Sequence, residues 1–328
     1  KRPAEGLCGI SEMISSIPRP FQWQLTQWKE LLSRYLRGVL PHALLMSGPK
    51  FVGKENFAIA LAHRLLCLSS ELETDQACGQ CKGCYLCLAG NHPDFMLIEP
   101  EDKGKEIKIK QIRVVASFVS KSAHQGGWKI IMINPIDKMS PESKVALLKI
   151  LEEPEGKTVF VIVSHEAGRV PSTITSRCQK ITFPVPPEKN VIKWLQDSSN
   201  DENKVTKALD LSNGKPLLAQ QYLSGSVIKQ HDEFNTILDD LWFGQVSPVE
   251  AAQKCHQKKT LELMDWYRFR VQSMAKDRCD GDLVPEIFFF YDKLNKARNW
   301  LIESNPNPKL LWEELFFDWT ALSKKLIS

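Results

Sequence analysis

Short apolar runs alternate with longer helical patterns over the first half of the chain. The runs at 42–48 (HALLMSG), 128–134 (WKIIMIN) and 158–164 (TVFVIVS) have the length and composition of buried strands. Residues 54–68 predict a helix that is apolar on all sides, and a second helix is expected over 141–154, after a Ser that is typical of an N-cap and with Pro at its first position. Strands separated by helices predict an α/β fold with a parallel sheet and helices on its faces.

Strand patterns stop after KITF at 180–183, and helical patterns follow. The stretch FPVPPE at 183–188 contains three prolines and predicts a linker. Residues 188–223 predict a small helical unit with a break at NGK (213–215), and the rest of the chain predicts further helices. Five of the nine Trp lie beyond residue 240, where apolar residues recur every three to four positions, so we interpret them as helix-packing core.

Composition and charge argue against a membrane protein, a secreted protein and a strongly basic nucleic-acid-binding protein. The chain has 328 residues, of which 43% are hydrophobic and 25% charged, with a formal net charge of +4. This mild positive charge permits contact with a phosphate backbone but is not typical of a protein that binds nucleic acid by charge alone. No stretch has the length of a membrane helix or of a secretion signal, so we expect a cytoplasmic protein whose nine cysteines stay reduced.

The sequence GPKFVGKEN at 48–56 is close to a phosphate-binding loop. Gly48, Gly53 and Lys54 occupy the positions of the G-x-x-x-x-G-K pattern, between a predicted strand and a predicted helix. Glu55 stands where a Ser or Thr hydroxyl would coordinate Mg²⁺, and its carboxylate would repel bound phosphates. We therefore expect no magnesium-dependent hydrolysis, whereas anion binding by Lys54 and the backbone N–H groups stays open.

A second departure lies at the end of the predicted strand 128–134. Hydrolysing P-loop proteins have an acidic residue there that holds Mg²⁺. This chain has Asn134 followed by Pro135, and Asp137 lies three residues further on, out of phase with the strand end. Two independent departures indicate a site that does not hydrolyse ATP.

Five cysteines cluster between residues 67 and 87. Cys78, Cys81, Cys84 and Cys87 are spaced as C-x-x-C turns, and Cys67 closes the preceding helix while Cys87 begins the next helical pattern. Such clustered thiols predict a closed structural zinc site, with a redox C-x-x-C or an iron–sulfur cluster as alternatives. Five candidates for four positions leave the ligand set open at this stage.

Arg177 lies in STITSRCQ (172–179). A guanidinium that no local carboxylate pairs with can act on the γ-phosphate of a neighbouring subunit, as an arginine finger does. Taken alone, the tripeptide SRC favours a surface or ion-pairing arginine over this role. Cys178 follows a buried-looking segment, so we expect it to pack rather than to bind metal.

The order of these motifs resembles that of the bacterial clamp-loader subunits of the AAA+ class. The resemblance is carried by the loop at 48–54, the cysteine cluster, LLKILEEP (147–154) and VPSTITSRC (170–178). AGNHPDFMLIEP (89–100) is similar to the delta-prime branch of the DNA polymerase III holoenzyme rather than to the ATP-hydrolysing gamma/tau branch. Gamma/tau relatives have a Ser or Thr, an acidic pair and a lid arginine at three positions. These positions are here Glu55, Asn134 with Pro135, and Leu217.

The resemblance implies a fold of three domains. These are a RecA-like AAA+ module over 1–184 with a zinc insertion at 67–87, a small helical lid over 185–225 and a helical collar over 226–328. It also implies that Cys67, Cys78, Cys81 and Cys84 bind Zn²⁺ and that Cys87 does not.

The function that the resemblance implies is that of a non-hydrolysing stator. The chain would belong to a hetero-pentamer with gamma/tau and delta subunits, which loads the sliding clamp on primer–template DNA, and Arg177 would act in trans on a neighbour's ATP. It would thus be a subunit of a DNA-directed DNA polymerase without intrinsic ATPase activity. The alternatives are an autonomous AAA+ ATPase, or a zinc-ribbon DNA-binding protein.

Overall fold

The structure is a computed structural model of the chain. It describes residues 17–69, 75–102, 105–125, 127–152, 156–197, 199, 201–256, 260–277, 284–304 and 306–327. Residues 1–16 of the first expected domain and Pro154 at the expected end of the second helix lie outside this set. The chain forms two compact units, residues 1–194 with 214–218 and residues 195–213 with 219–328.

The first unit is built on a sheet of five parallel strands in the order β2-β3-β4-β1-β5. The strands are β1 Ala43–Ser47, β2 Phe95–Ile98, β3 Lys129–Ile133, β4 Thr158–Ser164 and β5 Gln179–Thr182. The three apolar runs and the KITF segment are confirmed as strands. β2 was not predicted, because it has only four residues and only Ile98 among them is fully buried.

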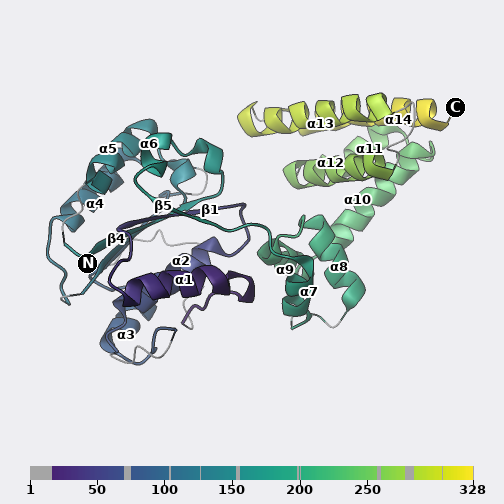
Figure 1. Cartoon of the computed structure of the whole chain (residues 1–328). Coiled ribbons are helices and arrows are strands. Elements are labelled where there is room, and N and C mark those ends of the chain that lie inside the picture. The colour runs from purple at the N-terminus through teal and green to yellow at the C-terminus, as the bar shows by residue number, and fades with distance from the viewer. Residues whose placement is uncertain are drawn as a thin grey trace. The chain divides into compact units, whose positions relative to one another are not determined.

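Helices cover both faces of this sheet (Figure 1). Alternate residues of each strand point to opposite faces. Leu44, Met46 and Val161 pack against the helices α1 (Leu25–Leu36) and α2 (Lys54–Leu66). Leu45, Ile131 and Phe160 face the other way and pack against three helices. These are α4 (Ile109–Val119), α5 (Pro141–Glu152) and α6 (Ser172–Thr175).

Helix α2 confirms the expectation of a helix that is apolar on all sides. From Phe57 to Leu66 every side chain is buried. It begins at the loop after β1, while β3 and β4 end at the same edge of the sheet, since all strands are parallel. The loop at 48–54 and the two strand ends are therefore brought together at one edge, as ligand sites of parallel sheets commonly are.

The second unit is helical throughout the part that the structure describes. It contains α8 (Glu202–Leu211), most of α9 (Pro216–Ser224), and α10 (Val227–Trp242). The rest is α11 (Pro248–Cys255), α12 (Thr260–Asp277), α13 (Val284–Ser304) and α14 (Pro308–Ile327). α7 (Glu188–Gln196) starts directly after the proline-rich stretch, and α8 and α9 meet at the expected break at 213–215.

Aromatic side chains form the core of this unit. Tyr267, Trp312 and Trp319 are almost fully buried, and the Tyr267 ring packs against both indoles. The Trp319 indole donates to the carbonyl of Leu238 at 3.0 Å. This confirms that the late tryptophans pack helices together, with the exception of Trp300, which is 49% exposed.

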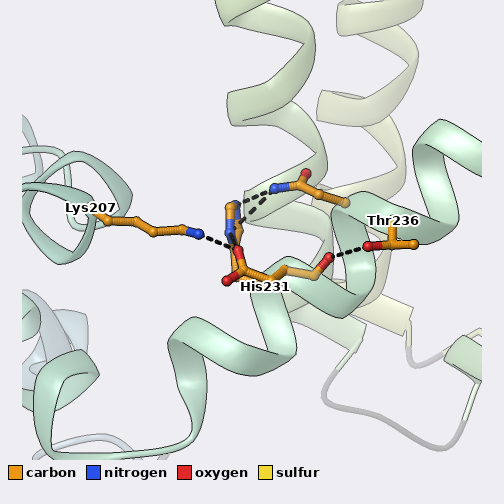
Figure 2. Close-up of polar contacts among 5 residues, drawn as sticks. Lys207, His231 and Thr236 are labelled. Carbon is orange, nitrogen blue, oxygen red and sulfur yellow. Dashed lines mark hydrogen bonds and ion pairs between the residues drawn. The ribbon is translucent and has the colours of Figure 1, made fainter. Parts of the chain in front are cut away.

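A polar contact joins α8 to α10 within this unit (Figure 2). Lys207 of α8 pairs with Asp232 of α10. Next to it, the buried ring of His231 accepts a hydrogen bond from Asn235 Nδ2 at 3.0 Å and packs edge-on against Trp266. Burial lowers the pKa of His231, and the neighbouring Asp232 carboxylate opposes this shift.

Gly48 connects β1 to the following loop, at a point where the backbone at the end of β5 comes close. Its φ is +155°, and a Cβ built there would lie 2.0 Å from the carbonyl oxygen of Phe183, which directly follows β5. Phe183 N in turn donates to the Ser47 carbonyl at 2.8 Å. The glycine therefore permits the pairing of β1 with β5, with or without a phosphate ligand.

We expect Gly48→Ala to destabilise the isolated chain by about 2 kcal/mol or more, because the new Cβ must displace backbone that cannot bend away cheaply. Urea unfolding without any nucleotide measures this. Gly168→Ala is the matched control, since a Cβ at Gly168 meets no atom within 4 Å. Equal stability of the two variants would contradict the structural role of Gly48.

Candidate functional site

The loop after β1 directs its lysine back onto itself. Gly53, in the left-handed region at φ +90°, precedes α2, and the Lys54 Nζ donates to the carbonyl of Pro49 at 2.6 Å. Burial lowers the pKa of Lys54 to about 8, while Glu55 and Asp137 oppose this shift. The side chain is therefore still charged at neutral pH, and it donates to a carbonyl of the same loop that would cradle a phosphate.

Glu55 pairs with a residue that sequence reasoning missed. Its Oε1 lies 3.4 Å from Nε2 of His165, the residue directly after β4. Both side chains are largely buried, at 22% and 15% exposure. Burial lowers the pKa of His165, and the Glu55 carboxylate opposes that effect. Glu55 stands where a complete phosphate loop has a Ser or Thr hydroxyl, and here it links α2 to the end of β4.

The end of β3 carries no charge of its own but lies beside a half-buried carboxyl group. Asn134 Nδ2 donates to Glu99 Oε1 at 3.0 Å, and Glu99 directly follows β2. Burial raises the pKa of Glu99, with the Asn134 hydrogen bond acting against it. The sequence did not identify Glu99, since β2 itself was not recognised as a strand.

The Asp137 carboxylate accepts two hydrogen bonds from within the chain. It lies in the short 3₁₀-helix Ile136–Lys138 after β3, and accepts from Ser164 Oγ at 2.8 Å and from His165 N at 2.5 Å. Both donors belong to the end of β4. This carboxylate therefore ties β3 to β4, in agreement with the expectation that it lies out of phase with the strand end.

The four cysteines at 67, 78, 81 and 84 come together in space. Their sulfur atoms all lie within 4.8 Å of one another, and the pairs Cys67–Cys81 and Cys78–Cys84 are each 3.9 Å apart. Sulfur atoms 2.3 Å from a tetrahedral ion lie roughly 3.8 Å apart. Among the described residues, this is the one group of His, Cys, Asp and Glu side chains close enough to share a metal ion.

Backbone N–H groups support the thiolate form of Cys81, which a metal site requires, whereas burial raises the pKa of Cys67 and Cys84. Cys81 Sγ accepts from Leu68 N at 3.3 Å and from Cys84 N at 3.4 Å. Burial alone would raise the pKa of Cys81, but these hydrogen bonds outweigh it and lower the pKa to about 6. The residues present therefore fit a closed metal site.

Cys87 lies outside this group. The expectation that Cys87 begins a helix was wrong: α3 spans Lys82–Leu88, so Cys87 is close to its end. Its side chain packs in the core beneath α2, and burial raises the pKa of its thiol to about 12. Cys178 is also a packed thiol, half-buried against the core on the other face of the sheet, as expected.

The cysteine segment is fixed to the core at two points. A Cβ on Gly83 would lie 2.3 Å from the carbonyl oxygen of Leu66, so α3 sits directly on the last turn of α2. The Trp28 indole of α1 donates to the carbonyl of Asp75 at 2.9 Å. The insertion is therefore part of the first unit's packing.

Arg177 follows α6 and precedes β5. Its Nη1 donates to the carbonyl of Thr173 at 2.8 Å, and its Nη2 lies 2.5 Å from Oε1 of Glu152, the last residue of α5. The premise that no local carboxylate pairs with Arg177 was wrong. Glu152 lies 25 residues away in the sequence, so the local motif did not reveal it.

Comparison with known proteins identifies the family. The family model described as "DNA polymerase III, delta subunit" matches residues 23–187. DNA polymerase III subunit delta' of Pseudomonas aeruginosa is 31% identical, over 92% of this chain and 98% of its own length. This chain belongs to the delta-prime family of DNA polymerase III subunits.

Further delta-prime relatives match over shorter stretches. The Haemophilus influenzae subunit is 30% identical over 80% of this chain and 79% of its own. The Bacillus subtilis subunit is 35% identical over 69% of this chain and 70% of its own. The stretch matched by the family model, residues 23–187, contains both the loop at 48–54 and the cysteine segment at 67–87. In the part of the chain that the structure describes, no helix has the length and apolar character needed to cross a membrane.

The burial of Lys54 leads to a pH dependence of stability. Between about pH 8 and 10.5 the unfolded chain binds more protons than the folded one, so folding stability should rise with pH through this window. Lys54→Met lacks this contribution, and its stability relative to the parent protein should fall as pH rises from 8 to 10. Urea unfolding at several pH values measures the difference, with Lys29→Met, an exposed lysine of α1, as control. If the stability of the parent protein and of Lys54→Met changed with pH in parallel, the lowered pKa of Lys54 would be contradicted.

Proposed function

We propose that this chain is a non-hydrolysing delta-prime subunit of the DNA polymerase III clamp loader, which helps to place the sliding clamp on primer–template DNA during replication. Membership of the delta-prime family supports this proposal most directly. The geometry of the loop edge agrees with it, because Glu55, Asn134 and Asp137 each have a partner within the chain. A magnesium ion would have to break these contacts to bind there.

The proposed architecture is that of an AAA+ clamp-loader subunit. The sheet-containing module would cover 1–184, the lid 185–225 and the collar 226–328. The chain would assemble with gamma/tau and delta subunits in a cytoplasmic hetero-pentamer and act as its stator. The buried aromatic core of the second unit gives the collar the stability that a subunit-packing domain needs.

Arg177 is the residue that we propose to act in catalysis, in trans on the ATP of a neighbouring subunit. Its side chain is 36% exposed, which leaves it reachable from outside the chain. The two contacts use two of its five N–H groups, so three stay available for phosphate oxygens. Planar, permanently charged guanidinium groups suit this role.

The proposed cofactor is one structural Zn²⁺ held by Cys67, Cys78, Cys81 and Cys84. When bound, the ion would cross-link the start of α3 to the end of α2, and with four protein ligands it would have no open position for catalysis. Gly48, Gly53 and Lys54 could hold a nucleotide's phosphates only if Lys54 left the Pro49 carbonyl.

Replacing Arg177 by Ala should lower the ATPase activity of a clamp loader reconstituted with gamma/tau and delta subunits. The site that Arg177 serves should lose roughly 10³–10⁵ in rate, and the whole complex less, because other sites continue to turn over. Steady-state phosphate release measures this, and gel filtration checks that the complex still assembles. Unchanged turnover in the Arg177→Ala complex would reject the trans role. If instead the isolated chain hydrolysed ATP and Lys54→Ala abolished that activity, the chain would be an autonomous ATPase.

Metal analysis of the purified chain should find about one zinc per molecule. Cys84→Ser should remove most of it, since the site loses one of four thiolates. Cys87→Ser is the control and should retain the metal, because Cys87 packs in the core. Full zinc occupancy in Cys84→Ser would contradict the ligand set.

A further inference from the structure

Two motifs that are distant in the sequence meet at a single ion pair. Glu152 belongs to LLKILEEP and Arg177 to VPSTITSRC, and their side chains are 2.5 Å apart. Glu152 is the last residue of α5, whereas Arg177 lies just beyond α6. The topology thus brings an acid from one helix end to the guanidinium that we propose to be an arginine finger.

Helix stability does not account for Glu152. The C-terminal end of a helix carries a partial negative charge, so a carboxylate at the last residue of α5 is unfavourable for that helix. Packing does not account for it either, because the side chain is 51% exposed. Among the residues that the structure describes, the favourable side-chain interaction of Glu152 is with Arg177.

The contacts at Arg177 fix the plane of its guanidinium. Thr173 O accepts from Nη1, and Glu152 Oε1 accepts from Nη2, so the group is held from two different elements. A free arginine side chain has many rotamers, and ordering it at the moment of reaction is costly. Both elements are themselves fixed, since Leu151 and Ile174 beside these contacts are fully buried in the core.

We propose that Glu152 is a positioning residue for Arg177. It orders the guanidinium in advance, so that the remaining N–H groups are presented outward to a neighbouring subunit's phosphate. This inference rests on the proposed trans role of Arg177. The effect is limited in size, because an exposed ion pair that orders a side chain changes a rate by about two- to fivefold.

The test uses the reconstituted clamp loader and a double-mutant cycle. Glu152→Ala should lower kcat for ATP about two- to fivefold with little change in KM, and Glu152→Gln, which keeps a neutral acceptor of the same length, should recover part of the loss. In an Arg177→Ala background, Glu152→Ala should have no further effect. Glu166→Ala is the matched control. Glu166 is an exposed carboxylate of the same unit, and its Oε2 lies 2.6 Å from Nε of Arg169. Its removal should leave kcat unchanged.

A second measurement does not depend on the partner subunits. In the isolated chain, the Nε–H resonance of Arg177 can be assigned by its loss in Arg177→Ala. Its nitrogen relaxation should report a more mobile side chain in Glu152→Ala than in the parent protein or in Glu166→Ala. Unchanged mobility in Glu152→Ala would overturn the positioning role.

The kinetic outcomes separate this inference from the proposed function. If Arg177→Ala has no effect on turnover, the trans role itself fails. If Arg177→Ala lowers turnover but Glu152→Ala does not, or raises it, only the positioning role is overturned. Equal losses from Glu152→Ala in both backgrounds would also overturn it, because they would show that Glu152 acts independently of Arg177.

Discussion

The first unit depends on the burial of α2 against one face of the parallel sheet. Every side chain from Phe57 to Leu66 is buried, so the helix cannot be moved without loss of the core. A tight connection from β1 is needed to place it, and Gly48 permits this connection beside the Phe183 carbonyl. Packing alone thus gives Gly48 a role in the strand–loop–helix, although the chain departs from the phosphate-loop pattern at Glu55.

The edge of the sheet next to α2 is held together by its own polar groups. Charged groups taken out of water are costly unless they have partners. Here Glu55 pairs with His165, Glu99 accepts from Asn134, and Asp137 accepts from the end of β4. These contacts join α2, β2, β3 and β4 without a ligand. A proposed stator benefits from such an arrangement, because its shape then does not change with a nucleotide cycle of its own.

The sequence predicted those parts of the fold whose signal is local. β1, β3, β4 and α2 were found because continuous apolar runs report full burial, and the cysteine cluster because its spacing is diagnostic. β2 was missed because it is short and half-exposed. His165, Glu99 and Glu152 carry no local signal, since each gains its role from a partner on a different element. Such pairings follow from the order of strands in the sheet, which local patterns do not encode.

The guanidinium of Arg177 is held at two points without being enclosed. Both partners lie on helices that pack on the sheet face opposite α2. Each face of the sheet has its own core, and under the proposed function the two faces serve separate purposes: the α2 face also carries the metal segment, and the α4–α6 face carries Arg177. Because Arg177 takes its orientation from α5 and α6, the departures at the loop 48–54 would leave undisturbed the residue that we propose to act on the neighbouring subunit.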